Sequence, residues 1–151
     1  MEGLDVRTPW HLWVVGVLSL VWNAFGAWDY TQTQLQNREY IAAMTEPMGI
    51  TIDQALAYYE SFPAWMDTAW ALGVWGAVLG SVLLLLRSRL AVISFIVSLF
   101  GLFVGTLYGI ADPMPGVGHT AMTIGFSIVL WLIAIALIIY SRQRAKFNHL
   151  R

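Results

Sequence analysis

The sequence predicts an all-α membrane protein with four transmembrane helices. Of its 151 residues, 58% are hydrophobic and 11% are charged, whereas a soluble domain is about 45–50% apolar and about 25% charged. A transmembrane helix needs about 20 apolar residues, and four stretches qualify, at residues 10–28, 64–86, 90–110 and 120–140. We therefore expect a single transmembrane domain over residues 1–151. This composition excludes a soluble enzyme and a nucleic-acid-binding protein.

The distribution of charge predicts how these spans are oriented. Seven of the eight Lys and Arg residues fall on one predicted side and only Arg38 falls on the other, while seven of the nine acidic residues lie on the side of Arg38 or at its edge. Positive residues beside short spans stay in the cytoplasm, so we expect both termini to be cytoplasmic. The seven basic residues are Arg7, Arg87, Arg89, Arg142, Arg144, Lys146 and Arg151; the seven acids are Asp29, Glu39, Glu46, Asp53, Glu60, Asp67 and Asp112.

The connection after the first span, residues 29–63, is predicted to be an external and partly helical loop. Residues 30–44 contain no Gly or Pro, which predicts that the first helix continues by about four turns. Pro47 and Gly49 then break the helix. Thr51 followed by Gln54 fits a capping box that opens a short amphipathic helix. We expect that helix to lie on the membrane surface or to cap the bundle.

The second and third spans are separated only by residues 87–89, so they must form an antiparallel hairpin. Both carry glycines at four-residue spacing, and small residues on one face let helices approach closely in lipid. We interpret these glycines as packing residues within the hairpin, with a dimerisation face as the alternative. They are Gly76 and Gly80 in the second span and Gly101, Gly105 and Gly109 in the third.

The fourth span is apolar on every face over residues 130–140, which predicts contact with lipid around much of its circumference. None of the four spans has an ionisable residue near its middle. Such residues usually mark a transport pathway, so the sequence argues against proton-coupled transport through a central carboxylate. Asn23 is the main polar side chain within a span. We expect it to bond to another helix, with contact to a ligand as the alternative.

The histidines and the missing cysteines argue against a metal or a cofactor. The chain has no cysteine, and His11 and His149 lie on the side predicted to be opposite to His119, so no pair can hold a haem in the core. Although His119 and Asp112 could reach one metal ion, the Pro- and Gly-rich residues 113–118 read as an ordinary tight connection. No nucleophile–base motif, phosphate-binding loop or dinucleotide fingerprint occurs. We expect no metal, no cofactor and no enzymatic activity.

One group of external residues could bind a solute. Trp22 and Asp29 share a face of the first helix, and Asp67 and Trp70 share a face of the second at the same predicted depth. Carboxylates with aromatic walls suit an organic cation through cation–π attraction, or a sugar through hydrogen bonds and ring stacking. The alternative is that the tryptophans only anchor the helices at the membrane interface. With Asn23, these four residues are the candidate binding residues.

The chain also resembles a group of small four-helix inner-membrane proteins of proteobacteria, over about its first two thirds. The resemblance rests on Trp22-Asn23, Gly26, Asp29-Tyr30, the Phe-Pro-Ala-Trp run at 62–65 and the run ALGVWGAVLGS at 71–81. Members of this group are sometimes labelled sugar transporters. The resemblance implies a multi-pass protein of the bacterial inner membrane.

Two functions follow from these observations. The first, which the glycine faces and the missing intramembrane charge favour, is a non-catalytic accessory or structural subunit of a membrane complex. Its partners would be the lipid bilayer and either another membrane protein or a second copy of the chain. The alternative is a transporter or binder of a sugar or organic cation that acts as an oligomer, which the external aromatic and acidic residues favour.

Overall fold

The computed structural model describes residues 7–118 and 120–151, and these residues form helices joined by short connections. Four of the helices are long and apolar enough to cross a membrane, namely α1, α4, α5 and α6. The expected all-helical fold with four candidate spans is confirmed. The helices are α1 (Trp10–Gln34), α2 (Arg38–Thr45), the 3-10 helix η1 (Glu46–Met48), α3 (Ile52–Glu60), α4 (Ala64–Leu85), α5 (Leu90–Ala111) and α6 (Ala121–Lys146).

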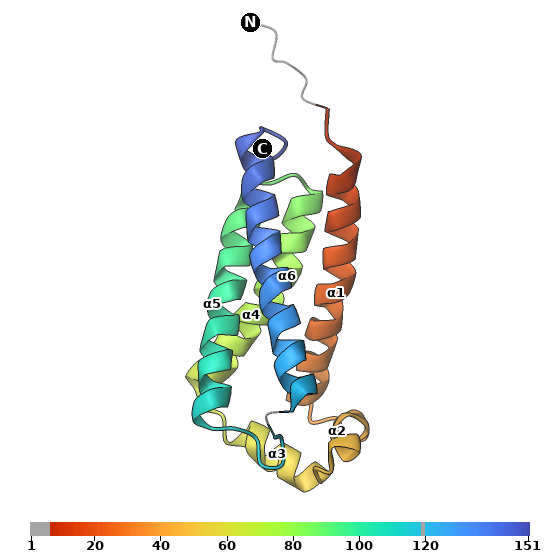
Figure 1. The fold of residues 1–151 in the computed structure, drawn as a ribbon, viewed down its shortest axis with the longest axis vertical. Coiled ribbons are helices and arrows are strands. Elements are labelled where there is room, and N and C mark those ends of the chain that lie inside the picture. Colours follow the sequence, from red (N-terminus) through yellow and green to blue (C-terminus); the bar gives the residue numbers. More distant parts are fainter. Residues whose placement is uncertain (1–6, 119) are drawn as a thin grey trace, which may run out of the picture.

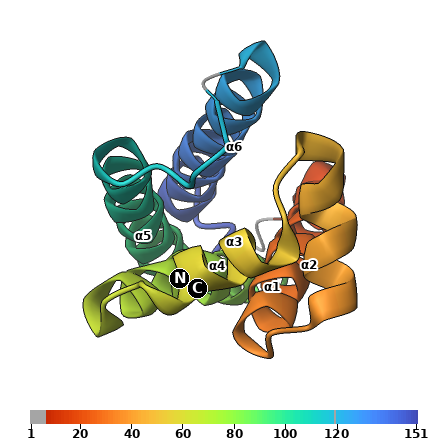
Figure 2. The same ribbon diagram turned by 90° about the horizontal axis from the view of Figure 1, so that it is seen from below.

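The four long helices run side by side, and α2 and α3 lie across one end of them (Figure 1). We call this end, formed by residues 29–63 and 111–118, the cap end. At the opposite end α1 begins, α6 ends and α4 turns into α5; we call it the basic end because Arg87, Arg89 and Arg144 lie there. Seen from the cap end, α6 leans away from α1 (Figure 2).

The hairpin of α4 and α5 is the most closely packed pair of helices. A Cβ atom added to Gly101 would lie only 2.5 Å from the carbonyl oxygen of Ala69, and one added to Gly76 would lie 3.2 Å from the amide nitrogen of Ser98. In addition, Ser94 Oγ donates a hydrogen bond of 2.8 Å to the carbonyl oxygen of Gly76. The two backbones therefore touch where glycines and serines replace larger side chains.

The glycines of the hairpin differ in what surrounds them. A Cβ on Gly80 would meet the ring of Phe95 at 2.7 Å, whereas one on Gly105 would meet only the Met66 Cε atom, at 3.6 Å. Gly109 has nothing within 4 Å of such a Cβ. Gly73, which the sequence analysis did not single out, faces Gly101 directly. The close contact is thus centred on Gly73 and Gly101 and does not extend to the end of the glycine series.

Helix α1 packs on α4 and α6 packs on α5. The Asn23 side chain donates to the carbonyl oxygen of Ala77 at 3.2 Å and to Ser81 Oγ at 2.9 Å, which is the interhelical bonding expected for it. On α6, Trp131 Nε1 donates to Thr106 Oγ1 at 3.2 Å. Only Leu137 and Ser141 of α6 are buried, consistent with a helix that faces lipid over most of its surface.

The expected continuation of the first helix through residues 30–44 is wrong. Helix α1 ends at Gln34, and Gln36 adopts a left-handed conformation with φ of 51°. Asn37 causes the break, because its side chain accepts a hydrogen bond from the amide of Tyr40 and so caps a new helix, α2. The break expected at Pro47 and Gly49 is present as η1 and a Gly49 φ of 75°, and the Thr51 capping box opens α3.

The basic end is closed by the last residues of the chain. After α6, the backbone turns at Asn148 (φ of 57°), and the amide of Arg151 donates to the carbonyl oxygen of Arg87 at 2.6 Å. The amide of Arg89 donates back to the carbonyl oxygen of Arg151 at 2.8 Å. Leu150 is 1% exposed and belongs to the hydrophobic cluster that includes Leu12. Residues 147–151, which we call the tail, thereby seal this end of the bundle.

Candidate functional site

A cavity of about 150 Å³ lies at the cap end, between the last turn of α1, helix α3 and the first turns of α4. Its walls combine aromatic, amide and acidic side chains, and include no Lys, Arg or His. Because only acids contribute formal charge, the cavity favours a cationic ligand over an anionic one. The lining residues are Thr33, Gln34, Gln36, Leu56, Tyr59, Glu60, Asp67 and Trp70.

The aromatic wall consists of two stacked rings. Tyr59 lies against Trp70 with their centroids 5.7 Å apart and their planes inclined by 19°, while Tyr30 meets Trp70 edge-on at 5.0 Å. Phe62 extends the cluster toward Tyr108 on α5, with a centroid distance of 5.1 Å. Offset stacking and edge-to-face contacts are the favoured arrangements of aromatic pairs, so the cluster fixes α3 against α4 and α5.

Each acid in the cavity is paired with a glutamine. Gln34 Nε2 donates to Asp67 Oδ1 at 3.2 Å, and Gln36 Nε2 donates to Glu60 Oε1 at 2.9 Å. A carboxylate can accept further bonds beyond the one from the amide. Both acids therefore keep acceptor capacity for a ligand, and the neutral glutamines orient them without compensating their charge.

Asp29 lies outside the cavity lining and is bonded to a tyrosine of α2. Tyr40 donates its hydroxyl proton to Asp29 Oδ1 at 2.9 Å. Burial and this contact with Asp29 raise the pKa of Tyr40 from 10.0 to about 12. Burial, followed by the nearby charge of Asp29, also raises the pKa of Tyr59 to about 12. Both phenols stay protonated at neutral pH, and Tyr40 ties α2 to the end of α1.

The structure brings together only part of the predicted binding group. Asp67 and Trp70 line the cavity, and Asp29 lies close enough to Tyr59 to influence the pKa of its phenol. Trp22 is 37% exposed and is absent from the cavity lining, and Asn23 is bonded to α4. Trp22 and Asp29 share a face of α1 by their spacing, but their surroundings differ: Tyr40 of the cap contacts Asp29, and Trp22 is exposed.

Six of the eight residues that line the cavity were not predicted as binding residues, among them Gln36, Tyr59 and Glu60. Gln36 reaches Glu60 only because the chain breaks after Gln34. Tyr59 lies in the short amphipathic helix that the capping box predicted, and its hydroxyl and the following Glu60 carry polar chemistry. An aromatic–acid pair at the end of a short amphipathic helix was the signal that could have identified them.

Among residues 7–118 and 120–151, no group of three or more His, Asp or Glu side chains could hold a metal ion. His11 Nδ1 lies 2.6 Å from the hydroxyl of Tyr140 at the basic end, and His149 lies beside Arg144. His119, considered above with Asp112, lies outside the described residues.

The fold and the cavity are consistent with a small integral membrane protein that has a polar, acidic hollow at one end. No family model, curated protein or solved structure matches the chain. A function must therefore be argued from the shape and the lining of the cavity.

Proposed function

We propose that this chain is a non-catalytic accessory subunit of the bacterial inner membrane that binds a small organic cation at its cap end. The observation that carries the proposal is the cavity itself, in which Asp67 and Glu60 lie beside the stacked rings of Tyr59 and Trp70 with no basic side chain in the lining. A quaternary ammonium group is attracted both to carboxylates and to aromatic faces. A sugar would gain the stacking and hydrogen bonds but not the charge attraction.

The size of the cavity favours a small ligand. Its volume of about 150 Å³ is below the roughly 300 Å³ at which pockets for drug-sized molecules begin. A monovalent ammonium compound with few carbon atoms suits this volume better than a disaccharide. Binding is also favoured over transport because Asn23, the main polar side chain in the membrane-spanning part of α1, is already bonded to α4.

The orientation and the accessory role belong to the same proposal. Seven of the eight Lys and Arg residues lie at the basic end, where α1 begins and α6 ends, which supports cytoplasmic termini and an external cap. Single cysteines introduced into the cysteine-free chain test this orientation. The variant Ala43→Cys, at an exposed position of α2, should react with an impermeant maleimide in spheroplasts, and Gln143→Cys, at an exposed position near the end of α6, should not. The reverse labelling would place the cavity in the cytoplasm.

Calorimetry of the purified protein in detergent tests the ligand. Tetramethylammonium and choline should give saturable heats, whereas glucose should give none. The double variant Asp67→Asn with Glu60→Gln should weaken binding of the cations at least tenfold. The matched control is Glu39→Gln with Glu46→Gln, which removes two exposed acids of the cap that do not line the cavity. Equal losses in the two double variants, or no saturable heat in the unmodified protein, would contradict the proposal.

The second candidate is transport of the same cation by an oligomer, the alternative that the sequence also left open. It is favoured by the small buried portion of α6, which leaves this helix available to another membrane-embedded chain. Gentle extraction followed by native mass measurement distinguishes the candidates. A foreign membrane protein bound to the chain supports the accessory role, and a homo-oligomer that accumulates choline in proteoliposomes supports transport.

A further inference from the structure

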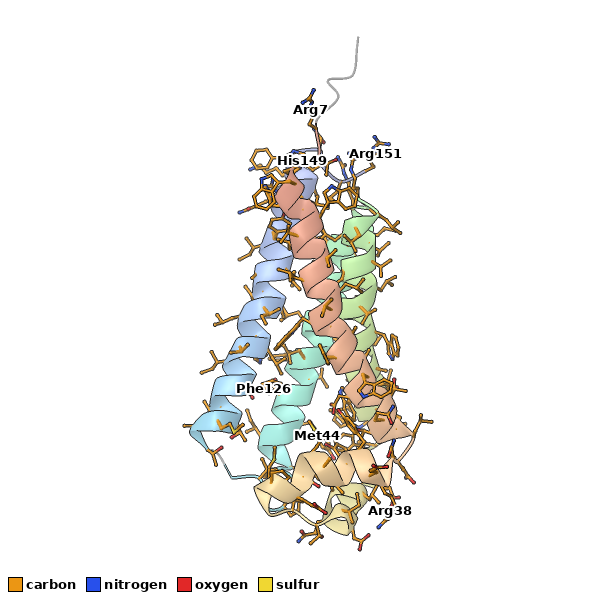
Figure 3. All side chains as sticks on the ribbon, turned by 90° about the vertical axis from the view of Figure 1, so that its right-hand side faces the viewer. Arg7, Arg38, Met44, Phe126, His149 and Arg151 are labelled. Carbon is orange, nitrogen blue, oxygen red and sulfur yellow. The ribbon has the colours of Figure 1, made fainter. Side chains whose placement is uncertain are left out.

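The basic end carries positive charge that the described part of the protein does not neutralise. In residues 7–118 and 120–151, every Asp and Glu side chain belongs to the cap end or to the helix ends beside it, and Glu2 and Asp5 lie outside the described residues. Figure 3 shows Arg7, His149 and Arg151 at the basic end and Arg38 at the opposite one. Within the described chain, the basic end therefore has no acidic side chain to pair with its arginines.

Arg87 and Arg144 are the half-buried arginines of the basic end, and Arg144 is the one with an unpaired buried nitrogen. Its Nε atom is buried and has no hydrogen-bond partner among the described residues. The guanidinium is held by rings, with its carbon 5.4 Å from the centroids of both Tyr140 and Phe147. Its other contact is Nη1 with His149 Nδ1 at 3.4 Å, which joins two groups that can both be positive. A half-buried charge of this kind needs an anion nearby.

The neighbours of Arg144 converge on the same place. Arg87 donates through Nε to the carbonyl oxygen of His149 at 3.2 Å, which fixes the tail beside Arg144. Partial burial and the positive charges of Arg144, His11 and Arg87 lower the pKa of His149 below its ordinary value of 6.5. These side chains come from α1, from the α4–α5 turn, from α6 and from the tail, so the positive field is shared by every element that meets there.

Apolar and aromatic side chains surround this positive region. Trp10 is 75% exposed, Leu86 70% and Phe147 58%, and all three lie at the ends of membrane-spanning helices or beside them. Exposed aromatic rings at this level are typical of the membrane–water interface. The phosphate group of a phospholipid bound at Arg144 would therefore lie at headgroup depth, and the acyl chains of that lipid would lie alongside the apolar helices.

We infer that Arg144, with Arg87 and His149, forms a binding site for the phosphate group of an anionic phospholipid. The guanidinium fork suits phosphate oxygens, and the exposed apolar surface favours a phospholipid over a free phosphate ion. The site lies at the opposite end from the cavity and does not depend on the function proposed for it.

Native mass spectrometry of the full chain in a nonionic detergent tests the site. With phosphatidylglycerol or cardiolipin added, the protein should retain a bound lipid and melt at a higher temperature, because a ligand that binds only the folded state stabilises it. Phosphatidylcholine and inorganic phosphate should have little effect. Equal stabilisation by inorganic phosphate would show a free-anion site, and equal retention of phosphatidylcholine would show ordinary solvation by lipid; both would overturn the inference.

Variants separate a specific site from general attraction. Arg144→Gln should weaken retention of the anionic lipid at least tenfold, whereas Arg142→Gln, which removes the same charge from an exposed position two residues away, should leave it nearly unchanged. Equal losses in both variants would show diffuse attraction and contradict the inference. If Arg144→Gln fails to fold, Arg144→Lys keeps the charge but loses the planar fork; a several-fold loss of retention supports the site, and unchanged retention refutes it.

Discussion

At the cap end, two short helices lie across the bundle and leave a cavity lined by acids, whereas at the basic end five tail residues fold against the bundle and bury Leu150 in its core. The difference follows from how each segment is anchored. The cap is held by aromatic contacts and side-chain hydrogen bonds such as that of Tyr40 with Asp29. The tail is held by backbone hydrogen bonds, by hydrogen bonds from the Arg87 and Arg89 side chains to its carbonyl oxygens, and by one fully buried apolar side chain, Leu150.

The two ends therefore offer different chemistry to a ligand. At the cap, ring contacts and glutamine hydrogen bonds join α1, α3 and α4 around the cavity, which Asp67 and Glu60 help to line. The tail pairs through its backbone and buries Leu150 in the core cluster, and the arginines beside it have no acidic side chain within the described residues to pair with. The first end suits a small solute and the second suits a lipid headgroup.

The largest effect is expected from Leu150→Ala, which tests whether the tail stabilises the basic end. Leu150 packs in the cluster containing Leu12, Leu84 and Phe95, and removing a fully buried leucine costs about 2–5 kcal/mol of unfolding free energy. Leu86→Ala is the matched control, because Leu86 lies at the same end but is 70% exposed. Equilibrium unfolding in SDS, followed by tryptophan fluorescence, measures both. Similar small changes in the two variants would mean that the tail is not a stabilising part of the fold.

A second prediction concerns the hairpin that connects the two ends. Gly101→Val should destabilise the protein by about 1–3 kcal/mol, because the added side chain would overpack the backbone of α4. Gly109→Val is the control: it is the same change on the same helix, at a position with nothing within 4 Å. Both variants change the intrinsic helix propensity equally. The difference between their unfolding free energies in SDS therefore isolates the helix contact, and no difference would contradict it.

The parts of the fold that were predictable depend on local chemistry. Four apolar lengths and the three-residue connection at 87–89 were sufficient to place the long helices and the hairpin. The break after Gln34 could not be placed, because neither Gly nor Pro marks it and the left-handed conformation of Gln36 depends on the capping by Asn37. The tail could not be predicted either, since its partners lie about 60 residues earlier in the chain.

The cavity was only partly predictable, because it also depends on the break after Gln34 and on contacts between segments far apart in the sequence. Asp67 and Trp70 were identified from their spacing on one helix. The other wall comes from the end of α1 and from α3, whose positions depend on the unpredicted break. Trp22 and Asp29 share a helix face, but Tyr40 covers Asp29 from a helix that the sequence did not separate from α1. Periodicity predicts which residues share a face; it does not predict which face another segment will cover.

The third prediction tests the anchoring of the cap. Tyr40→Phe should cost about 1–3 kcal/mol of unfolding free energy, because it leaves the partly buried Asp29 carboxylate without its tyrosine donor. Tyr58→Phe should cost less, about 0.5–1.5 kcal/mol, because the Tyr58 hydroxyl donates to an exposed backbone carbonyl, that of Asp112. SDS unfolding gives both values. A larger loss from Tyr58→Phe would show that the cap is held mainly to the α5–α6 connection and not to α1.

The smallest effect is expected from pH, to which the two ends should respond in opposite directions. The raised pKa of Tyr40 and Tyr59, about 12 against 10.0, means that the fold favours their neutral form. Their contribution to stability is therefore complete below pH 10 and is lost as the pH rises toward 12.

The lowered pKa of His149 means that the fold favours neutral imidazole, so this contribution is present above pH 6.5 and is lost as the pH falls below that value. Melting temperatures measured across this range should thus decline at both extremes. Tyr40→Phe should reduce the alkaline decline. His149→Gln should reduce the acid one, because Arg144, Arg87 and His11 would then face a side chain that cannot acquire charge. If His149→Gln leaves the acid decline unchanged, the repulsion at the basic end is not what destabilises the protein in acid, and the field inferred around Arg144 is weaker than the structure indicates.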